Sequence, residues 1–181
     1  MGERTSSVGQ EEYEIGIVGA GPVGLLAAIA LAQTGAKIAI WDPKKAQATP
    51  HSAPITLRLS SKRLLEKLGV WARIKTIPVA VRALHIAHGQ YFGSVHFAHQ
   101  EYGGEALAYV VDSRQLAEAL YETSRAQALV HYEDSTVARI IRTPQGYSCE
   151  YQQAGQPGKA RVKRVVVCDG AKSLLSEQLG V

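Results

Sequence analysis

Three glycines and one acid near the N-terminus form the pattern of this sequence that most clearly indicates a ligand-binding site. Gly19, Gly21 and Gly24 follow the pattern G-x-G-x-x-G, and Asp42 comes about 20 residues later. Glycines at these places allow a tight turn, a close approach of the backbone to a pyrophosphate, and close packing of a helix on a strand. A carboxylate at this distance can accept hydrogen bonds from ribose hydroxyls. The pattern therefore predicts that an adenine dinucleotide binds here.

The strands and the helix predicted around the glycine pattern make the dinucleotide interpretation more specific. Residues 14–18 have the composition of a short buried strand, residues 25–32 that of a helix, and residues 38–41 that of a second strand. The N-terminus of the helix would offer free N–H groups and the positive end of the helix dipole to phosphates. The residues expected to contact the dinucleotide in this region are Gly19, Gly21, Pro22, Val23, Gly24 and Asp42.

Length and composition favour one α/β domain with a real core. The chain has 181 residues, 46% of them hydrophobic, and a net charge of +4, which is ordinary for a globular protein. Basic residues gather at 159–164, but they alternate poorly into one strand face. We therefore expect a solvated edge there and no nucleic-acid partner. The two cysteines, Cys149 and Cys168, have no metal or disulfide spacing and suit a reducing cytosol.

The remaining segments predict further strands and helices around this start. Residues 1–12 are polar and predict a disordered leader without a signal peptide, so the domain would run over residues 13–181. Prolines and lysines in residues 42–54 predict a loop. The other predicted elements are helices over 60–68, from Asp112 or Ser113 to 126 and after Ser173, and strands over 81–88, 93–99, 107–111 and 129–132.

A change of period marks the last third of the chain. Residues 137–142, 147–152 and 161–167 predict three strands with tight turns, which is an antiparallel meander. The final three valines, 165–167, are apolar on both faces and indicate a return to a buried parallel sheet. Such a meander argues against a plain NAD-binding domain, which would continue with strand–helix units. Asp169 and Gly170 follow directly after the last strand.

Histidines occur in two pairs, His85 with His88 and His96 with His99, each at i, i+3 spacing. On a strand such a pair points to opposite faces, whereas a metal needs convergent ligands. We therefore expect no metal site. No Ser-His-Asp or Cys-His arrangement is visible, and no catalytic residue is assigned.

Taken together, the motifs resemble the FAD-binding start of the class A flavoprotein aromatic hydroxylases, and among them the ubiquinone-biosynthesis hydroxylases. The likeness runs from about residue 13 to residue 181. It rests on the glycine pattern with Asp42, on residues 60–71, on Tyr109-Val110-Val111 before Gln115, and on the Asp169-Gly170 motif. The resemblance implies a Rossmann-like FAD-binding domain with a parallel sheet and an inserted antiparallel β-meander. It also implies that Gln115, Asp169 and Gly170 contact the cofactor.

The resemblance further implies an oxidoreductase, a monooxygenase that uses FAD and takes electrons from NAD(P)H. Reduced flavin activates O₂, and one oxygen atom is transferred to an aromatic, phenolic substrate; the cofactor supplies this chemistry. By the same resemblance, the substrate would be a polyprenylated quinone precursor. The protein would be cytoplasmic, with a peripheral place at the inner membrane, as an oligomer or with other quinone-biosynthesis proteins.

Departures from the family pattern limit these expectations. The family places an Asp and an Arg before the helix over residues 60–68, where this sequence has His51 and Ala53, so Arg58 is the candidate substitute that holds the flavin. Ser176 stands where the second motif has an Arg, and the third, Gly-Asp motif is not found. The chain thus looks like the N-terminal half of a hydroxylase, incomplete for turnover. The alternatives are an NAD(P)-binding dehydrogenase or reductase domain and a non-catalytic accessory subunit.

Overall fold

The computed structural model describes residues 11–43, 52–89, 93–170 and 173–179. The chain divides into two compact units: unit 1 takes residues 1–48 and 121–181, and unit 2 takes residues 49–120. The expected leader falls outside the described residues except for Glu11 and Glu12, which begin the first strand. That residues 13–181 act as a single FAD-binding domain stays a prediction.

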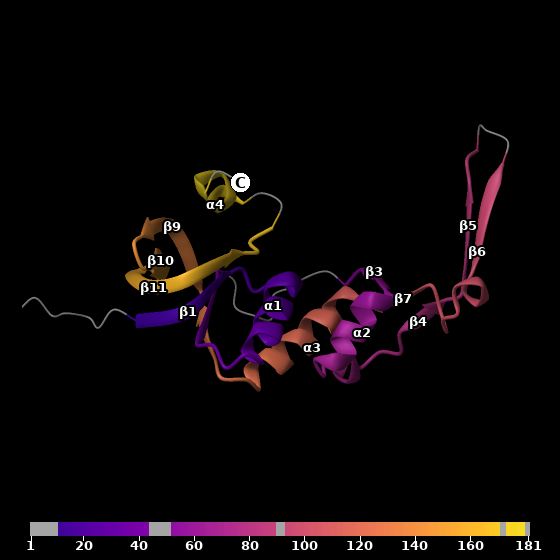
Figure 1. The fold of residues 1–181 in the computed structure, drawn as a ribbon, viewed down its shortest axis with the longest axis horizontal. Coiled ribbons are helices and arrows are strands. Elements are labelled where there is room, and N and C mark those ends of the chain that lie inside the picture. Colours follow the sequence, from indigo (N-terminus) through magenta and orange to yellow (C-terminus); the bar gives the residue numbers. More distant parts are fainter. Residues whose placement is uncertain (1–10, 44–51, 90–92, 171–172, 180–181) are drawn as a thin grey trace, which may run out of the picture. The chain divides into compact units, whose positions relative to one another are not determined.

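Unit 1 is built on a six-stranded mixed sheet (Figure 1). In sheet order its strands are β8 (Leu129–Glu133), β2 (Ile38–Asp42), β1 (Glu11–Val18), β11 (Gln156–Val167), β10 (Gly146–Gln153) and β9 (Ser135–Thr143). The first four strands run parallel, while β11, β10 and β9 pair antiparallel, so β11 belongs to both arrangements. The predicted parallel sheet with an antiparallel meander is confirmed.

Hydrophobic runs explain why β1 and β2 lie inside this sheet. Residues 15–18 of β1 and residues 38–41 of β2 are all buried, as expected for parallel strands covered on both faces. Helix α1 (Pro22–Ala32) contacts both strands and buries Leu25, Ala28 and Ile29. The short helix α4 (Leu174–Leu179) contacts β9.

Aromatic side chains fill the core beside the meander. The Trp41 ring is fully buried and stacks on Tyr132 with ring centroids 5.2 Å apart. Tyr13 stands edge-on to both rings, and its hydroxyl lies 2.7 Å from that of Tyr132. Tyr151 of β10 contacts Trp41 and Tyr132. These rings pack the parallel strands β1, β2 and β8 against the meander. Aromatic pairs in edge-on or offset stacking stabilise a fold beyond the contribution of buried apolar area.

The basic residues of β11 are solvent-exposed as predicted, but β11 is not an edge strand, so the predicted edge is wrong. β11 lies between β1 and β10, and alternate residues of a strand share one face. The side chains are exposed, but acids on both neighbouring strands face them. Three ion pairs result: Lys159–Glu150 at 3.1 Å, Arg161–Glu12 at 3.3 Å and Lys163–Glu14 at 3.1 Å.

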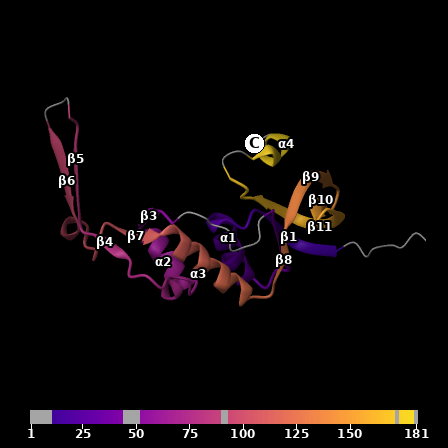
Figure 2. The same cartoon turned by 180° about the vertical axis from the view of Figure 1, so that it is seen from behind.

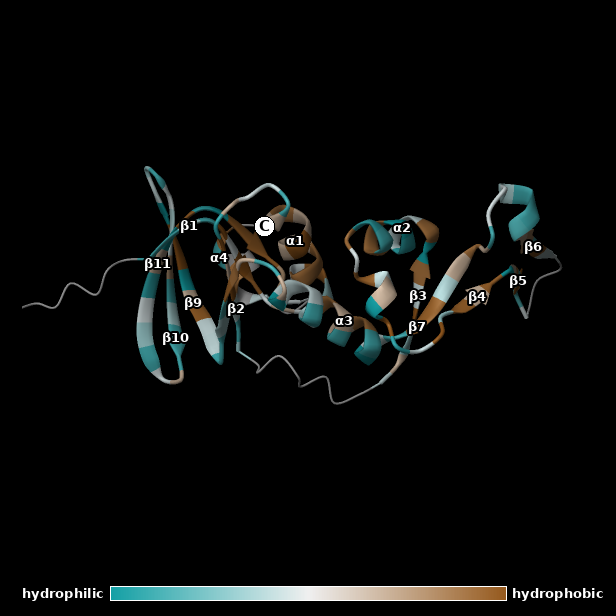
Figure 3. Ribbon diagram, turned by 90° about the horizontal axis from the view of Figure 1, so that it is seen from below, coloured by the Kyte–Doolittle hydropathy of each residue, from teal (hydrophilic) through white to brown (hydrophobic). Residues whose placement is uncertain are grey.

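Unit 2 contains an antiparallel three-stranded sheet in the order β3–β7–β4 and a separate hairpin of β5 and β6. The hairpin strands lie side by side in both views (Figures 1 and 2). Hydrophobic colour runs along β4 in Figure 3. The elements are β3 (Pro54–Arg58), α2 (Leu59–Lys67), a 3₁₀ turn at Trp71–Arg73, β4 (Val79–Val81), β5 (Ala83–Ala87), β6 (Ser94–Ala98), a 3₁₀ turn at His99–Tyr102, β7 (Ala108–Asp112) and α3 (Ser113–Arg125), whose last residues belong to unit 1.

Several local predictions for unit 2 can be compared with these elements. The hairpin, the strand at 107–111 and both helices are confirmed, whereas strands β3 and β4 were missed. Pro54 suggested a loop, yet proline is tolerated as the first residue of an edge strand. Asp112 is the cap of α3: its Oδ1 accepts the backbone N–H groups of Arg114 and Gln115 at 2.8 and 3.2 Å. The turn residue Gln90 lies outside the described residues.

Membrane-spanning helices are not found among the described residues, since none of the helices there combines the length and hydropathy that a span needs.

Candidate cofactor-binding site

The carboxyl ends of β1, β2 and β11 meet at one edge of the sheet of unit 1. The Gly19 N–H donates to the carbonyl oxygen of Trp41 at 2.8 Å, and the Cys168 N–H donates to that of Val18 at 2.7 Å. The glycine loop therefore lies between the ends of β2 and β11. The carboxyl edge of a parallel sheet is where open α/β folds bind ligands.

Gly19 and Gly24 are glycines because the protein itself leaves no room for a side chain. Gly19 has φ +100°, and a Cβ there would lie 2.5 Å from the carbonyl oxygen of Cys168. A Cβ on Gly24 would lie 1.9 Å from the carbonyl oxygen of Gly19. The predicted tight turn and the close packing of helix α1 on the sheet edge are thus seen directly.

Gly21 differs, because a Cβ there would meet no atom of the described residues within 4 Å. Gly21 is the N-cap of α1; its carbonyl oxygen accepts the first helical hydrogen bond, from Leu25 N–H at 2.9 Å. Pro22 takes the first helical position, where a missing N–H costs nothing. Val23 is 70% exposed. The space above Gly21 is therefore open, and the backbone there can be approached closely from outside.

Asp42 ends β2 directly against this loop. Its Oδ2 accepts the backbone N–H of Ala20 at 2.6 Å, and the side chain is half-buried. The spacing correctly brought Asp42 to the glycine loop. The contact with Ala20 was not predicted, because it depends on how the loop turns rather than on residue type.

Asp169 and Gly170 reach the same edge from the other side of β1. Asp169 is exposed, and its backbone nitrogen would lie 2.9 Å from a Cβ on Gly19. Gly170 has φ +101°, a conformation that favours glycine. The structure thus brings Asp169 and Gly170 to the glycine pattern, although about 150 residues separate them in sequence. Ala171 of the same motif lies outside the described residues.

Sequence reasoning did not predict that Cys168 lies at this site, because its spacing matched no motif. A Cβ on Gly24 would lie 3.3 Å from the Cβ of Cys168, so this half-buried side chain sits beneath the loop. Burial, and then the charge of Asp169, raise the pKa of the Cys168 thiol. Burial alone raises the pKa of Cys149 to about 11. Both thiols are free and stay protonated at neutral pH.

Arg58 and Gln115, the two other predicted cofactor residues, belong to unit 2. Arg58 ends β3, caps α2 and is exposed. Gln115 lies in the first turn of α3; its Nε2 donates to Glu118 Oε2 at 3.4 Å, while its Oε1 is buried without a hydrogen-bond partner. Their roles at the cofactor stay predictions.

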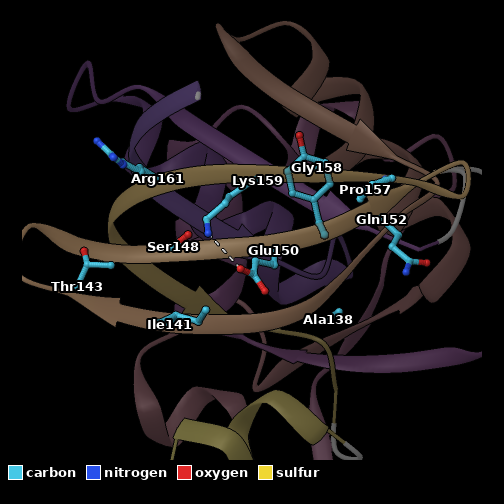
Figure 4. Close-up of a pocket in the computed structure, with 11 residues that line it drawn as sticks. Ala138, Ile141, Thr143, Ser148, Glu150, Gln152, Pro157, Gly158, Lys159 and Arg161 are labelled. Atoms are coloured by element: carbon cyan, nitrogen blue, oxygen red, sulfur yellow. Dashed lines mark hydrogen bonds and ion pairs between the residues drawn. The ribbon is translucent and has the colours of Figure 1, made fainter. Parts of the chain in front are cut away.

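The described ranges contain no cluster of three or more His, Cys, Asp or Glu side chains placed to hold a metal ion. A cavity of about 890 Å³ lies instead on the meander (Figure 4). It is lined from β9, β10 and β11, and Figure 4 shows the Glu150–Lys159 ion pair within it. None of the predicted cofactor residues lines this cavity, so it is separate from the glycine loop.

Comparison with known proteins agrees with this geometry. The chain is 27% identical over 178 residues to an uncharacterized protein of Synechocystis sp., covering 97% of this chain and 43% of that protein. It is also 27% identical over 178 residues to the ubiquinone hydroxylase UbiM of Neisseria meningitidis, covering 93% of this chain and 38% of that protein. The crystal structure of p-nitrophenol 4-monooxygenase PnpA from Pseudomonas putida matches the fold with a TM-score of 0.80 at 19% identity, over 94% of this chain and 44% of that one.

Fold and site together define an adenine-dinucleotide-binding flavoprotein module. More particularly, the chain belongs to the FAD binding domain family, which it matches over residues 12–181. It spans about two fifths of the length of the curated relatives above. FAD is therefore the cofactor, and the predicted resemblance to the flavoprotein hydroxylases is confirmed at the level of the family.

The residues at the sheet edge fit this cofactor. The open space above Gly21 lies at the N-terminus of α1, where N–H groups and the helix dipole favour a phosphate. An acid, Asp42, stands beside it at the end of the next strand.

Proposed function

We propose that this chain is the FAD-binding portion of an NAD(P)H-dependent flavoprotein monooxygenase that hydroxylates an aromatic substrate. The observation that carries the proposal is Gly21. Its neighbours Gly19 and Gly24 are required by internal packing, whereas no contact with the described part of the chain requires a glycine at 21. A pyrophosphate that lies against the backbone would explain why residue 21 is a glycine.

Each residue of the site has a part in this proposal. The backbone at Gly21 and the first turn of α1 hold the pyrophosphate, and Asp42 holds both the loop, through Ala20, and the adenosine ribose. Asp169 and Gly170 stand on the pyrophosphate side, at the end of β11. Arg58 and Gln115 are the proposed contacts from unit 2. When bound, FAD supplies the acceptance of hydride and the activation of O₂.

The finer proposal is that the substrate is a phenolic quinone precursor and that the protein binds at a membrane surface. The relationship to UbiM, named as a ubiquinone hydroxylase, supports the substrate class. From Lys67 to Gln100 the sequence has no Asp or Glu, and it includes Arg73, Lys75 and Arg82. Several apolar side chains in this stretch are exposed, namely Ile77, Val79, Leu84, Ile86 and Val95. Exposed apolar and cationic groups together favour anionic lipid. A place beside other quinone-biosynthesis proteins belongs to the same proposal.

The membrane part is checked by sedimentation with vesicles. We expect the chain to pellet with vesicles that contain anionic phospholipid and to stay in the supernatant with neutral ones. Equal recovery with both would refute peripheral binding through charge, and would leave the FAD assignment untouched.

FAD binding by the purified chain tests the cofactor site. We expect flavin absorbance to co-purify or to be restored by added FAD, with NADH alone binding far more weakly. Gly21→Val should weaken FAD binding at least tenfold, about 1.4 kcal/mol, because its side chain enters the pyrophosphate position. Thermal unfolding should change only by the small cost of a less favourable N-cap residue, because a Cβ at 21 meets none of the described residues.

Gly89→Val is the matched control. A Cβ at Gly89 also meets no described atom within 4 Å, but Gly89 lies in unit 2, after β5. This variant should bind FAD as the unaltered chain does. Full FAD affinity in Gly21→Val would show that the glycine loop is not the cofactor site.

A further inference from the structure

The β5–β6 hairpin brings together two histidines that the sequence leaves apart. His85 and His96 are directly opposite each other in the antiparallel register, with ring centroids 6.4 Å apart and planes at 53°. Both side chains are exposed. The spacing along the chain suggested the pairs His85 with His88 and His96 with His99. The proximity of His85 to His96 depends on the strand register, so it could not be predicted from that spacing.

The two rings share a face that is otherwise lined by small residues. Side chains alternate between the faces of a strand, so the neighbouring pairs on the histidine face are Ala83–Ala98 and Ala87–Ser94. The opposite face holds the larger apolar pairs Leu84–Phe97 and Ile86–Val95. Small neighbours leave both imidazoles free to turn toward a common ion.

We propose that His85 and His96 form an open, two-histidine site for a divalent transition-metal ion, Zn²⁺, Ni²⁺ or Cu²⁺. Imidazole nitrogens suit these ions. Bonds of about 2.0–2.1 Å from each nitrogen at a tetrahedral angle place the ring centroids about 5 Å apart. The observed separation of 6.4 Å is longer, so both exposed side chains must rotate toward each other to bind a common ion.

Water would complete the coordination, because the described residues offer no third His, Cys, Asp or Glu at this place. The site is therefore exchangeable and weaker than a structural zinc site with four protein ligands. Its effect would be on the hairpin itself. A two-stranded hairpin is only marginally stable in water, and an ion bound to both strands would fix the register that presents Leu84, Ile86 and Phe97 on the other face.

Titration calorimetry of the tag-free 181-residue chain with ZnCl₂ and NiCl₂ tests the site. We expect one ion per chain, and a loss of affinity of at least tenfold in both His85→Gln and His96→Gln. The double variant should lose little more than either single one, because one remaining imidazole does not chelate. Circular dichroism checks that the variants keep the fold.

His88→Gln, just after β5, and His99→Gln, at the start of the 3₁₀ turn that follows β6, are the control variants. Both should keep the metal affinity of the unaltered chain, and all four variants should bind FAD normally, since the glycine loop lies in unit 1. Absence of metal binding to the unaltered chain would overturn the proposal. Equal losses in the control variants, or full affinity in His85→Gln or His96→Gln, would overturn it as well.

Discussion

Gly21 and Gly24 lie in one loop, but the protein needs them for different reasons. Gly24 is held by contact with the backbone of Gly19, while Gly21 borders open space. A substitution at Gly24 should therefore act on stability, and a substitution at Gly21 should act on ligand binding. This separation makes it possible to test the fold and the cofactor site independently.

Gly24→Ala is expected to destabilise the chain by roughly 1–3 kcal/mol, the usual cost of overpacking. The added Cβ would lie 1.9 Å from a backbone oxygen that cannot rotate away. Urea unfolding measures the loss. Gly21→Ala is the control and should cost less, about 1 kcal/mol at most, because it only replaces a favourable N-cap residue. Unchanged stability in Gly24→Ala would contradict the packing described here.

At this scale, the sequence predicted the positions of the site but not the contacts within it. The spacing of Gly19, Gly24 and Asp42 was enough to predict that they lie at one edge of the sheet. The hydrogen bond from Ala20 N–H to Asp42 depends on the conformation of the loop. The packing of Cys168 beneath Gly24 depends on which strand pairs with β1. Neither property is encoded in a local pattern, so neither could be predicted.

Among the elements of unit 2, α2 is fixed to its surroundings by Lys62. The Lys62 ammonium lies 2.9 Å from Glu66 and 2.8 Å from Glu105. It also lies 5.1 Å from the ring centroid of Tyr109 and 5.7 Å from that of Trp71. Hydrogen bonds to Glu105 and then Glu66 raise the pKa of Lys62, so it stays charged at all ordinary pH values.

Lys62→Met is expected to lower the free energy of unfolding by roughly 1–2 kcal/mol, from lost cation–π contacts and partly exposed ion pairs. Urea unfolding of the variant measures this change. Lys67→Met, on the exposed last turn of the same helix, should change it by less than about 0.5 kcal/mol. Equal effects of the two substitutions would show that Lys62 has no special role in anchoring α2.

His131, in the outer strand β8, makes unit 1 sensitive to pH. Its Nε2 is buried without a hydrogen-bond partner. Burial, and then the charge of Arg125, lower the pKa of His131 in the folded protein. Because the folded pKa is depressed, the stabilising contribution is present above the unfolded pKa of about 6.5 and is lost as pH falls toward the folded pKa.

We expect urea unfolding at pH 7.5 and pH 5.5 to show a lower stability at the lower pH, by at most about 1.4 kcal/mol per pH unit from this one group. His131→Gln should flatten that dependence. His88→Gln, which alters an exposed histidine of unit 2, should leave it in place. A dependence that persists unchanged in His131→Gln would show that other groups cause it.

Helices, strands and caps could be predicted where a local pattern determines them. The meander, the hairpin and the cap of α3 were recognised from alternation, turns and a single acid. Prediction failed for β3, whose role as an edge strand depends on pairing with β7. It also failed for the basic residues of β11, because the acids that face two of them lie on β1.

The whole molecule consists of two units with unequal cores. Of the largest fully buried side chains in the described part of the chain, Val70 and Leu120 belong to unit 2, while unit 1 has Trp41 and four isoleucines. No local pattern distinguishes the units, since unit 2 is inserted between two parts of unit 1. The division depends on which strands pair, and that is set by the complete fold.

Unit 2 is therefore expected to unfold at a lower urea concentration than unit 1, by about 0.5 M or more. The two tryptophans report on them separately, since Trp41 lies in unit 1 and Trp71 in unit 2. Fluorescence of Trp71→Phe follows unit 1, and that of Trp41→Phe follows unit 2. Coincident transitions in the two variants would show that the units unfold together.

The pairing of β1 with β11 has a consequence for how the molecule is made. Glu11 is opposite Ala160, so the first strand must wait for a partner that the ribosome adds 149 residues later. At ordinary rates of translation this delay is about 7 to 30 s. During that time one side of β1 is an open edge that can attract other nascent chains. Flavin can be captured only once synthesis has passed β11, so cofactor loading must follow the pairing of β1 with β11.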